Sequence, residues 1–200
     1  MIRSVLDSPG VYRLWQAPFV HKKFRPIRDH GIDGFESVLD IGCGPGTNAR
    51  FFPNTRYVGL DLDAAYIAYA SSRFPGTFLA RDVNDGLADL GSFDLVLMNS
   101  LMHHLNDDEA SRLLRAAAEA VAPGGVVHIV DLVLPETRSL ARGLARLDRG
   151  KFARPYDEWV ALIGRHLTID LSRPYSVGLG PFRLWSLIHI VCHSPPAAAE

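Results

Sequence analysis

Three glycines at alternate positions, Gly42, Gly44 and Gly46, follow the short apolar segment Val38–Ile41. Glycine is used where φ must be positive, or where a ligand must touch the backbone without a Cβ in the way. A buried strand that ends in such a loop predicts a ligand lying against the main chain. The alternative is a tight strand–helix turn without a ligand, for which one glycine is enough.

Carboxylates follow the next two predicted strands. Asp61 stands 19 positions after Gly42, where it can accept two hydrogen bonds from the 2′,3′-diol of a ribose. The alternative role is a helix N-cap, for which Asp63 is better placed. Asp82 can accept from an adenine amino group while the Val83 N–H donates to the ring; otherwise Asp82 is a solvated loop residue.

Alternating strands and helices must position these residues. Apolar runs at the strands are nearly continuous, which is typical of a parallel sheet covered on both faces. In such sheets, ligands bind beyond the carboxyl ends of the strands. We expect strands over 37–41, 57–61, 77–80, 93–98 and 126–134, with helices over 64–74 and 107–121.

The flanking regions differ in pattern. Helices are expected over 138–151 and 156–166, and then two strands, 167–172 and 182–192, with no helix between them. Strands joined in that way pair antiparallel. Residues 1–36 indicate either an amphipathic helix packed on the domain or a flap over a substrate, with Pro26 interrupting or starting a helix. Residues 194–200 are expected to fray.

Composition narrows the class of protein. With 200 residues, 48% of them hydrophobic, the chain predicts one domain spanning residues 1–200. A net charge of −1 gives no reason to expect nucleic acid or an anionic membrane as partner, and the basic cluster at residues 21–28 is small. The spacing of Cys43 and Cys192 predicts neither a disulfide framework nor a metal site. Without a signal-peptide or membrane-spanning pattern, a cytoplasmic protein is expected.

The chemistry of the glycine loop separates two classes of nucleoside. A dinucleotide needs a pyrophosphate at a helix N-terminus, with G-x-G-x-x-G spacing. Here the spacing is D-x-G-x-G-x-G, and Asp40 at its start repels a pyrophosphate but suits an ammonium group. S-adenosylmethionine carries adenine, ribose, a sulfonium and an amino-acid tail, and it has no phosphate. An NAD(P)-dependent Rossmann oxidoreductase is the alternative that this spacing disfavours.

The ordered set of motifs resembles class I S-adenosylmethionine-dependent methyltransferases, in particular the small single-domain type-11/type-12 group. The matching segments cover about half of the chain. The resemblance implies a Rossmann-like, doubly wound α/β sandwich with a mostly parallel seven-stranded sheet and an antiparallel last strand. The segments are Val38–Thr47, Tyr57–Asp63, Ala80–Asn84, Phe93–Leu105 and Leu114–Asp131.

The resemblance also implies roles for the matching positions. S-adenosyl-L-methionine would be the methyl donor and S-adenosyl-L-homocysteine the product. The cofactor-binding residues fall into a group around the methionine part, a group at the ribose and adenine, and a floor beneath the sulfonium. They are respectively Asp40, Gly42, Cys43, Gly44 and Gly46; Asp61, Leu62, Asp82 and Val83; and Asn99 and Ser100.

For the methyl acceptor we expect a small molecule, with O-methylation favoured. His103 and His104 follow the fourth strand, and one of them would act as the base, His104 being preferred; a purely structural role is the alternative. The segment 134–155 would border the acceptor, with Arg149 or Arg154 facing an anionic group, unless both sit in a solvated loop. Together with Tyr12, Trp15 and Trp159, this segment indicates a partly apolar acceptor. A catalytically silent S-adenosylmethionine-binding module is the further alternative.

Overall fold

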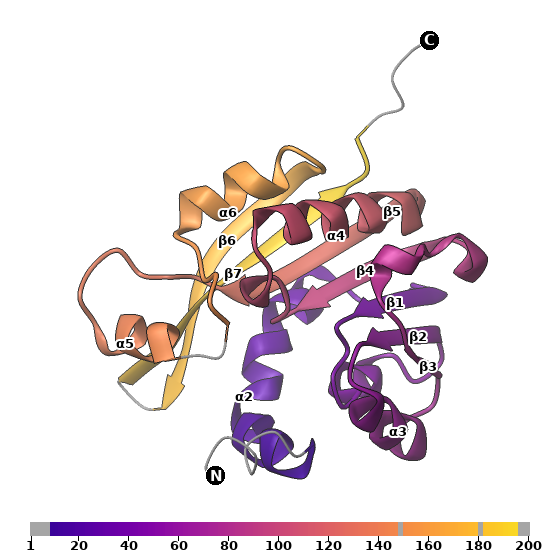
Figure 1. Ribbon diagram of the computed structural model, residues 1–200, viewed down its shortest axis with the longest axis horizontal. Coiled ribbons are helices and arrows are strands. Elements are labelled where there is room, and N and C mark those ends of the chain that lie inside the picture. The colour runs from indigo at the N-terminus through magenta and orange to yellow at the C-terminus, as the bar shows by residue number, and fades with distance from the viewer. Residues whose placement is uncertain (1–8, 148–149, 180–181, 196–200) are drawn as a thin grey trace.

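The computed structural model describes residues 9–147, 150–179 and 182–195, with the side chains of residues 9–18 outside the described part. One seven-stranded sheet, ordered β3-β2-β1-β4-β5-β7-β6, organises the fold (Figure 1). Strands β1 to β5 pair in parallel, and β7 lies antiparallel to both β5 and β6, which confirms the expected fold class. The strands are β1 (Ser37–Ile41), β2 (Arg56–Asp61), β3 (Thr77–Ala80), β4 (Phe93–Asn99), β5 (Val121–Leu132), β6 (Thr168–Leu179) and β7 (Phe182–His193).

Helices cover both faces of this sheet. Helices α4 and α6 pack on one face, and α2 and α3 lie on the other (Figure 1). Each face therefore has its own apolar core, one centred on the α4 stripe and Trp159, the other on Phe24, Ile27 and the aromatic residues near β2. The helices are α2 (Pro9–His30), α3 (Ala64–Arg73), α4 (Asp107–Ala120), α5 (Leu140–Leu147) and α6 (Tyr156–Ile163).

Helix α4 shows how local sequence specifies an element here. The side chain of Asn106 accepts from the backbone N–H of Glu109, and Glu109 accepts from the backbone N–H of Asn106, a reciprocal capping box. Acidic residues in the first turn suit the positive end of the helix dipole. Leu113, Leu114 and Ala117 are buried against the sheet, as their helical spacing predicts.

Several expected boundaries are corrected by tertiary packing. Helix α2 continues through Pro26 to His30, because Phe24 and Ile27 are buried on the sheet and outweigh the one backbone hydrogen bond that a proline removes. Strand β6 extends past the predicted end to Leu179, with Pro174 tolerated because β6 is an edge strand. Strand β5 begins five residues earlier than predicted, at Val121 instead of residue 126, and α5 occupies only the middle of the helix predicted over 138–151.

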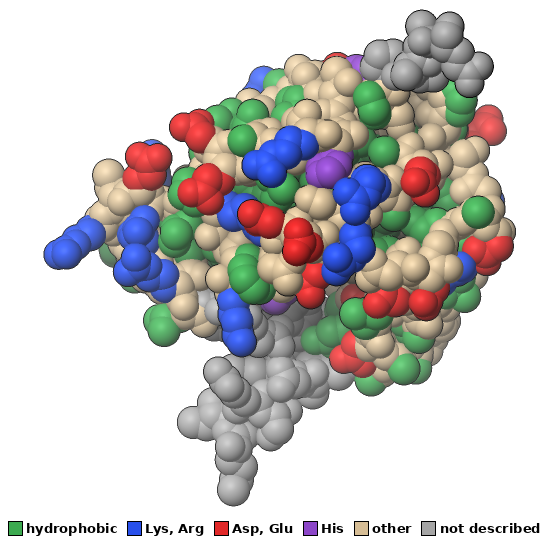
Figure 2. Space-filling view, turned by 45° about the horizontal axis from the view of Figure 1, so that its top comes forward, with side chains coloured by type: hydrophobic (Ala, Val, Ile, Leu, Met, Phe, Trp, Pro, Cys, Tyr) green, Lys and Arg blue, Asp and Glu red, His purple; other side chains and the backbone are tan. Residues whose placement is uncertain are grey.

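The topology brings the predicted site together. Parallel pairing places the carboxyl ends of β1, β2, β3, β4 and β5 along one edge of the sheet. The face carrying α4 and α6 shows acidic and basic side chains intermixed rather than a continuous basic surface (Figure 2). Within the described residues, no helix is both long and apolar enough to cross a membrane.

Candidate functional site

The glycine loop is held in its shape by a carboxylate from the neighbouring strand. Gly42 and Gly44 have φ values of +72° and +52°, which disfavour a side chain. The Gly44 N–H donates to Asp61 Oδ2 at 2.8 Å. A Cβ on Gly42 would lie 2.8 Å from Leu101 Cδ1, whereas one on Gly44 would enter open space. The loop backbone at Gly44 is therefore accessible to a ligand.

Asp61 and Asp63 divide the two roles that the sequence left open. Asp63 caps α3, accepting from the backbone N–H groups of Ala65 and Tyr66, which confirms the preference for Asp63 as the cap. Asp61 accepts from the backbone N–H of Asp63 through Oδ1 at 2.9 Å and from the glycine loop through Oδ2. A carboxylate offers about four acceptor positions. Asp61 thus keeps capacity for a ligand diol while it braces the loop.

A pocket of about 250 Å³ lies next to Asp61. Asp82 is also at its wall, where Oδ1 accepts both the backbone and the side-chain N–H of Asn84. Apolar walls with carboxylates at their rim suit a flat heteroaromatic ring joined to a diol. The pocket brings together the predicted ribose and adenine residues, with Leu101 and Arg112 in addition; its lining includes Gly42, Asp61, Leu62, Asp82 and Val83.

Asp40 is completely buried at the end of β1. Its Oδ2 accepts from the Tyr57 hydroxyl and from Asn48 Nδ2, the latter at 3.0 Å. Its Oδ1, also buried, has no hydrogen-bond partner among the described residues. Burial raises the pKa of Asp40 to about 6, although the donors Tyr57 and Asn48 oppose the shift. An unsatisfied buried carboxylate oxygen fits a cationic ligand group.

A chain of polar side chains links Asp40 to the end of β4. Asn99 Nδ2 donates to Asn48 Oδ1 at 3.2 Å, and the Ser100 hydroxyl donates to Asn99 Oδ1 at 3.2 Å. Ser100 adopts a φ of +61°, an unfavourable conformation for a residue with a side chain, and its N–H donates to Val130 O. Asn99 and Ser100 are therefore linked to Asp40 through Asn48, a residue that the sequence analysis did not single out.

The donor set of this site fits S-adenosylmethionine. Asp40 offers a carboxylate oxygen to an ammonium group, Asp61 offers acceptors to a diol, and Leu62 and Val83 offer apolar surface to adenine. The same two carboxylates, close to the loop backbone, would repel a pyrophosphate. Cys43 is 4% exposed and packs in the core beside α2 and α3, so only its backbone is placed to contact a ligand in the loop.

His103 pairs with a buried aspartate that sequence reasoning gave no role. Its Nδ1 lies 2.6 Å from Oδ1 of Asp131, and both side chains are almost fully buried. Burial alone would raise the pKa of Asp131, but His103 and the backbone N–H groups of Leu132 and Met102 outweigh it and lower that pKa. Asp131 lies near the carboxyl end of β5, and β5 is the neighbour of β4 in the sheet. This position, close to the residues that follow β4, was the signal in the sequence for a contact between Asp131 and His103.

The segment after α5 covers this pair. A Cβ on Gly150 would lie 2.0 Å from His103 Cδ2, which shows how closely the backbone packs on the imidazole ring. The Phe152 N–H donates to the His103 carbonyl at 2.9 Å. His104 is exposed, and its ring centre lies 4.2 Å from that of His103. The two histidines thus differ in burial and in their contact with Asp131.

Of the predicted acceptor residues Tyr12, Trp15, Arg149 and Arg154, the structure describes the side chain of Arg154. Arg154 is 7% exposed and turns inward, where its guanidinium bonds Asp107 and the carbonyls of Phe152 and Leu105 and stacks on a tryptophan ring. This placement is structural and does not present Arg154 to an anionic acceptor. Tyr12 and Trp15 belong to α2, but their side chains lie outside the described residues, as does Arg149.

Comparisons with known proteins agree with this geometry. A family model described as a methyltransferase domain matches residues 38–125. An uncharacterized methyltransferase of Mycobacterium bovis is 32% identical over 132 residues, which cover 60% of this chain and 66% of that protein. The trans-aconitate 2-methyltransferase of Acidovorax sp. is 30% identical over 178 residues, covering 84% of this chain and 67% of that one.

A methyltransferase of Haloferax volcanii, solved in complex with the activator Trm112, superposes with a TM-score of 0.75. It is 14% identical, with 97% of this chain and 99% of that chain covered, so this likeness concerns the fold. The chain spans about two thirds of the length of the curated relatives named above. By its motifs, its fold and its relatives, the chain belongs to the family of S-adenosylmethionine-dependent methyltransferases.

Proposed function

We propose that this chain methylates the oxygen of a small-molecule acceptor, with S-adenosyl-L-methionine as methyl donor and S-adenosyl-L-homocysteine as product. When bound, the donor supplies a methyl group on a cationic sulfur, a group already activated for displacement. The chain's own task is then to hold the acceptor, exclude water and remove a proton where the acceptor carries one. The contact between His103 and Asp131 is the observation that carries this proposal.

This contact supports a base role for His103. The lowered pKa keeps Asp131 ionised at neutral pH, and its oxygen accepts the Nδ1–H of His103. That hydrogen bond selects the imidazole tautomer in which Nε2 is the proton acceptor. A buried carboxylate behind a histidine also stabilises the imidazolium that forms when the proton is taken. We therefore propose His103, rather than His104, as the catalytic base.

The cofactor-binding roles rest on the donor set described above. Asp40 would hold the ammonium group of the donor and Asp61 the ribose diol, with Asp82 and Val83 at the adenine edge. Asn99 and Ser100 would form the floor beneath the sulfonium. Hydrogen bonds hold the side chains of Asp61, Asp82 and Asn99, and Asp40 is buried. These side chains are therefore positioned before the ligand binds, which supports the proposed roles.

Oxygen is favoured over nitrogen because a hydroxyl needs the base that the His103–Asp131 pair provides, whereas a neutral amine can attack without one. A relative named for trans-aconitate methylates a carboxylic acid. A carboxylate acceptor is already ionised at neutral pH and would not need His103. The dependence of the rate on His103 therefore separates hydroxyl acceptors from carboxylate acceptors.

The test compares His103→Asn with the matched neighbour His104→Asn. Both variants would be assayed for transfer of labelled methyl groups to panels of hydroxyl-bearing, carboxylate-bearing and amine-bearing small molecules. We expect His103→Asn to lower kcat/KM for a hydroxyl acceptor at least 100-fold and His104→Asn to change it less than fivefold. Affinity for S-adenosylhomocysteine, measured by calorimetry, should change less than twofold in either variant.

The pH profile gives a second readout. With a base in use, kcat/KM of the parent chain should rise with pH through one ionisation, and this rise should vanish in His103→Asn. Equal losses in the two variants would remove His103 from the proposal. Binding of S-adenosylhomocysteine with no transfer to any acceptor would instead support the silent binding module.

A further inference from the structure

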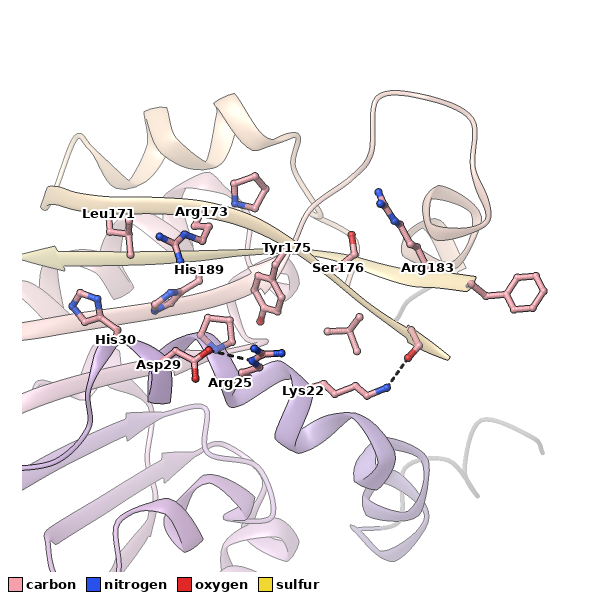
Figure 3. A pocket seen from close by; sticks show the side chains of 15 residues that line it. Lys22, Arg25, Asp29, His30, Leu171, Arg173, Tyr175, Ser176, Arg183 and His189 are labelled. Carbon is pink, nitrogen blue, oxygen red and sulfur yellow. Dashed lines mark hydrogen bonds and ion pairs between the residues drawn. The ribbon is translucent and has the colours of Figure 1, made fainter. Parts of the chain in front are cut away.

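A second, larger pocket lies between α2 and the β6–β7 pair, with a volume of about 890 Å³ (Figure 3). Its walls come from the last three turns of α2, from residues 171–178 of the edge strand β6, and from β7. The Lys22 ammonium donates to the Gly178 carbonyl at 2.9 Å, and the Tyr175 hydroxyl donates to the Lys23 carbonyl at 2.8 Å. These two bonds fix the distance between helix and strand, so the groove is a built feature.

The charges lining the groove are mostly positive. Four cations, Lys22, Arg25, Arg173 and Arg183, face one carboxylate, Asp29, while the whole chain has a net charge of −1. Asp29 is already paired with Arg25 at 3.1 Å. The side chains of Arg173 and Arg183 make no ion pair or hydrogen bond with other described residues. The groove therefore has uncompensated positive charge.

The four cations are spread along the groove, with Arg173 toward one end and Arg183 toward the other (Figure 3). Arg173 lies beside His189 and His30. His189 is buried and forms the floor, and the nearby Arg173 and His30 add to burial in lowering its pKa to about 4. Nearby positive charge favours the neutral form of the His189 imidazole, and a bound anion would offset that charge. Within the described residues, no group of three or more His, Cys, Asp or Glu is placed to hold a metal ion.

The groove is separate from the methyl-donor pocket. Strand register places Asn99, Val130, His189 and Arg173 in one row across four adjacent strands. Three strand spacings separate Asn99 from Arg173, about 14 Å. The two pockets share no lining residue. A ligand in the groove therefore contacts different residues from those proposed to hold S-adenosylmethionine.

We propose that this groove is a second binding site, for a small molecule that carries two or more negative charges on carboxylate or phosphate groups. Arginine guanidinium groups bind such oxygens in bidentate fashion, and the side chain of Arg173 is available for that contact. The volume is that of a metabolite site rather than of a surface that tracks a nucleic-acid backbone.

The test titrates the full chain with citrate and, separately, with pyrophosphate, and follows binding by calorimetry at constant ionic strength. We expect at least one of them to bind with a Kd below about 1 mM. Arg173→Glu should weaken that binding at least tenfold. The matched control Arg165→Glu, an exposed arginine outside the groove, should change it less than twofold. Which anion binds distinguishes carboxylate from phosphate chemistry.

Two further measurements keep the result interpretable. Affinity for S-adenosylhomocysteine should stay within twofold of the parent in both variants, because the pockets are separate. If Arg173→Glu fails to fold, as judged by thermal unfolding, Arg173→Gln takes its place with an expected loss of at least threefold. Failure of both anions to bind at 10 mM, or an equal loss in the Arg165 and Arg173 variants, would overturn the proposal.

Discussion

Asp40 and Asp131 are both fully buried carboxylates, and their pKa values move in opposite directions. Asp131 accepts hydrogen bonds from His103 and from two backbone N–H groups, and these interactions outweigh the effect of burial on its pKa. Asp40 receives only neutral donors, and one of its oxygens has no partner among the described residues. The fold thus satisfies Asp131 by itself and leaves Asp40 to be satisfied by a ligand.

The pKa of Asp40 predicts how donor affinity depends on pH. With a pKa of about 6 in the ligand-free chain, Asp40 is ionised at pH 7.5 and about nine-tenths protonated at pH 5. Only the carboxylate attracts an ammonium group. Affinity for S-adenosylhomocysteine should therefore fall about tenfold between pH 7.5 and pH 5, as measured by calorimetry.

Asp40→Asn should bind S-adenosylhomocysteine weakly at both pH values and lose this pH dependence. The control Asp33→Asn, which changes an exposed acid away from the site, should retain the parent's profile. A flat profile in the parent chain would contradict the assigned role of Asp40. So would an Asp40→Asn variant with unchanged affinity.

At the scale of elements, the segment from Gly150 to Arg154 forms neither a helix nor a regular strand, but several hydrogen bonds hold it in place. Arg154 bonds Asp107, the first residue of α4, and the Leu105 carbonyl before it. Val133 and Arg154 also form an isolated parallel bridge that carries the backbone on from β5. This arrangement holds the Gly150 backbone against His103 and makes the segment a cover for the proposed base.

We predict that Arg154→Ala loosens this cover. Several buried hydrogen bonds would be lost and their acceptors left without partners, which should lower the free energy of unfolding by about 2 kcal/mol. Part of the ion pair is solvent-exposed at Asp107, which keeps the effect modest. Urea denaturation measures the change, and kcat should fall with it because His103 loses its packing.

Arg154→Lys tests the geometry of the same contact. Lysine keeps the charge but cannot reach Asp107, Leu105 and Phe152 together as the planar guanidinium does. It should recover less than half of the lost stability. If Arg154→Ala were as stable as the parent chain and only acceptor affinity fell, the earlier prediction of Arg154 as an acceptor residue would be favoured.

At the scale of the whole molecule, α2 is held on the sheet partly by imidazole rings. His128 and His189, on β5 and β7, lie 3.2 Å apart through their ring nitrogens, and His30 of α2 stacks edge-on against His128. Burial is the main cause that lowers the pKa of His128 to about 3 and of His189 to about 4. Both rings are therefore neutral in the folded chain at ordinary pH.

This cluster predicts a loss of stability in acid. The folded pKa values lie below the unfolded value of about 6.5, so the unfolded chain takes up protons first as the pH falls. The contribution is fully present above pH 6.5 and is lost as the pH falls from 6.5 to the folded pKa, which is about 4 for His189 and about 3 for His128. From pH 7.5 to 5.5, each imidazole should lower the free energy of unfolding by about 1 kcal/mol.

Urea denaturation at the two pH values would measure this loss in the parent chain, in His128→Gln and in His189→Gln. Each variant should lose less stability on acidification than the parent. His21→Gln, a change at an exposed histidine, should lose as much as the parent. The same pH dependence in all four proteins would show that the buried imidazoles do not cause the acid sensitivity.

The fold and the donor pocket could be predicted from the sequence because their determinants are local. Gly42, Asp61 and Asp82 each lie at the end of a strand or within two residues of it, and parallel pairing brings such strand ends to one edge. The choice of Asp63 as helix cap was equally local. No knowledge of distant contacts was needed to place these residues side by side.

Tertiary structure alone decided the rest. His103 and Asp131 are 28 positions apart, Arg154 and Asp107 are 47 apart, and Lys22 and Gly178 are 156 apart. A buried arginine and a solvated one look the same in a sequence, because burial and pairing depend on which segments pack together. Local pattern therefore determined which residues meet in the candidate donor pocket. The partner of the proposed base, the inward direction of Arg154 and the basic groove depend instead on contacts between segments remote in sequence.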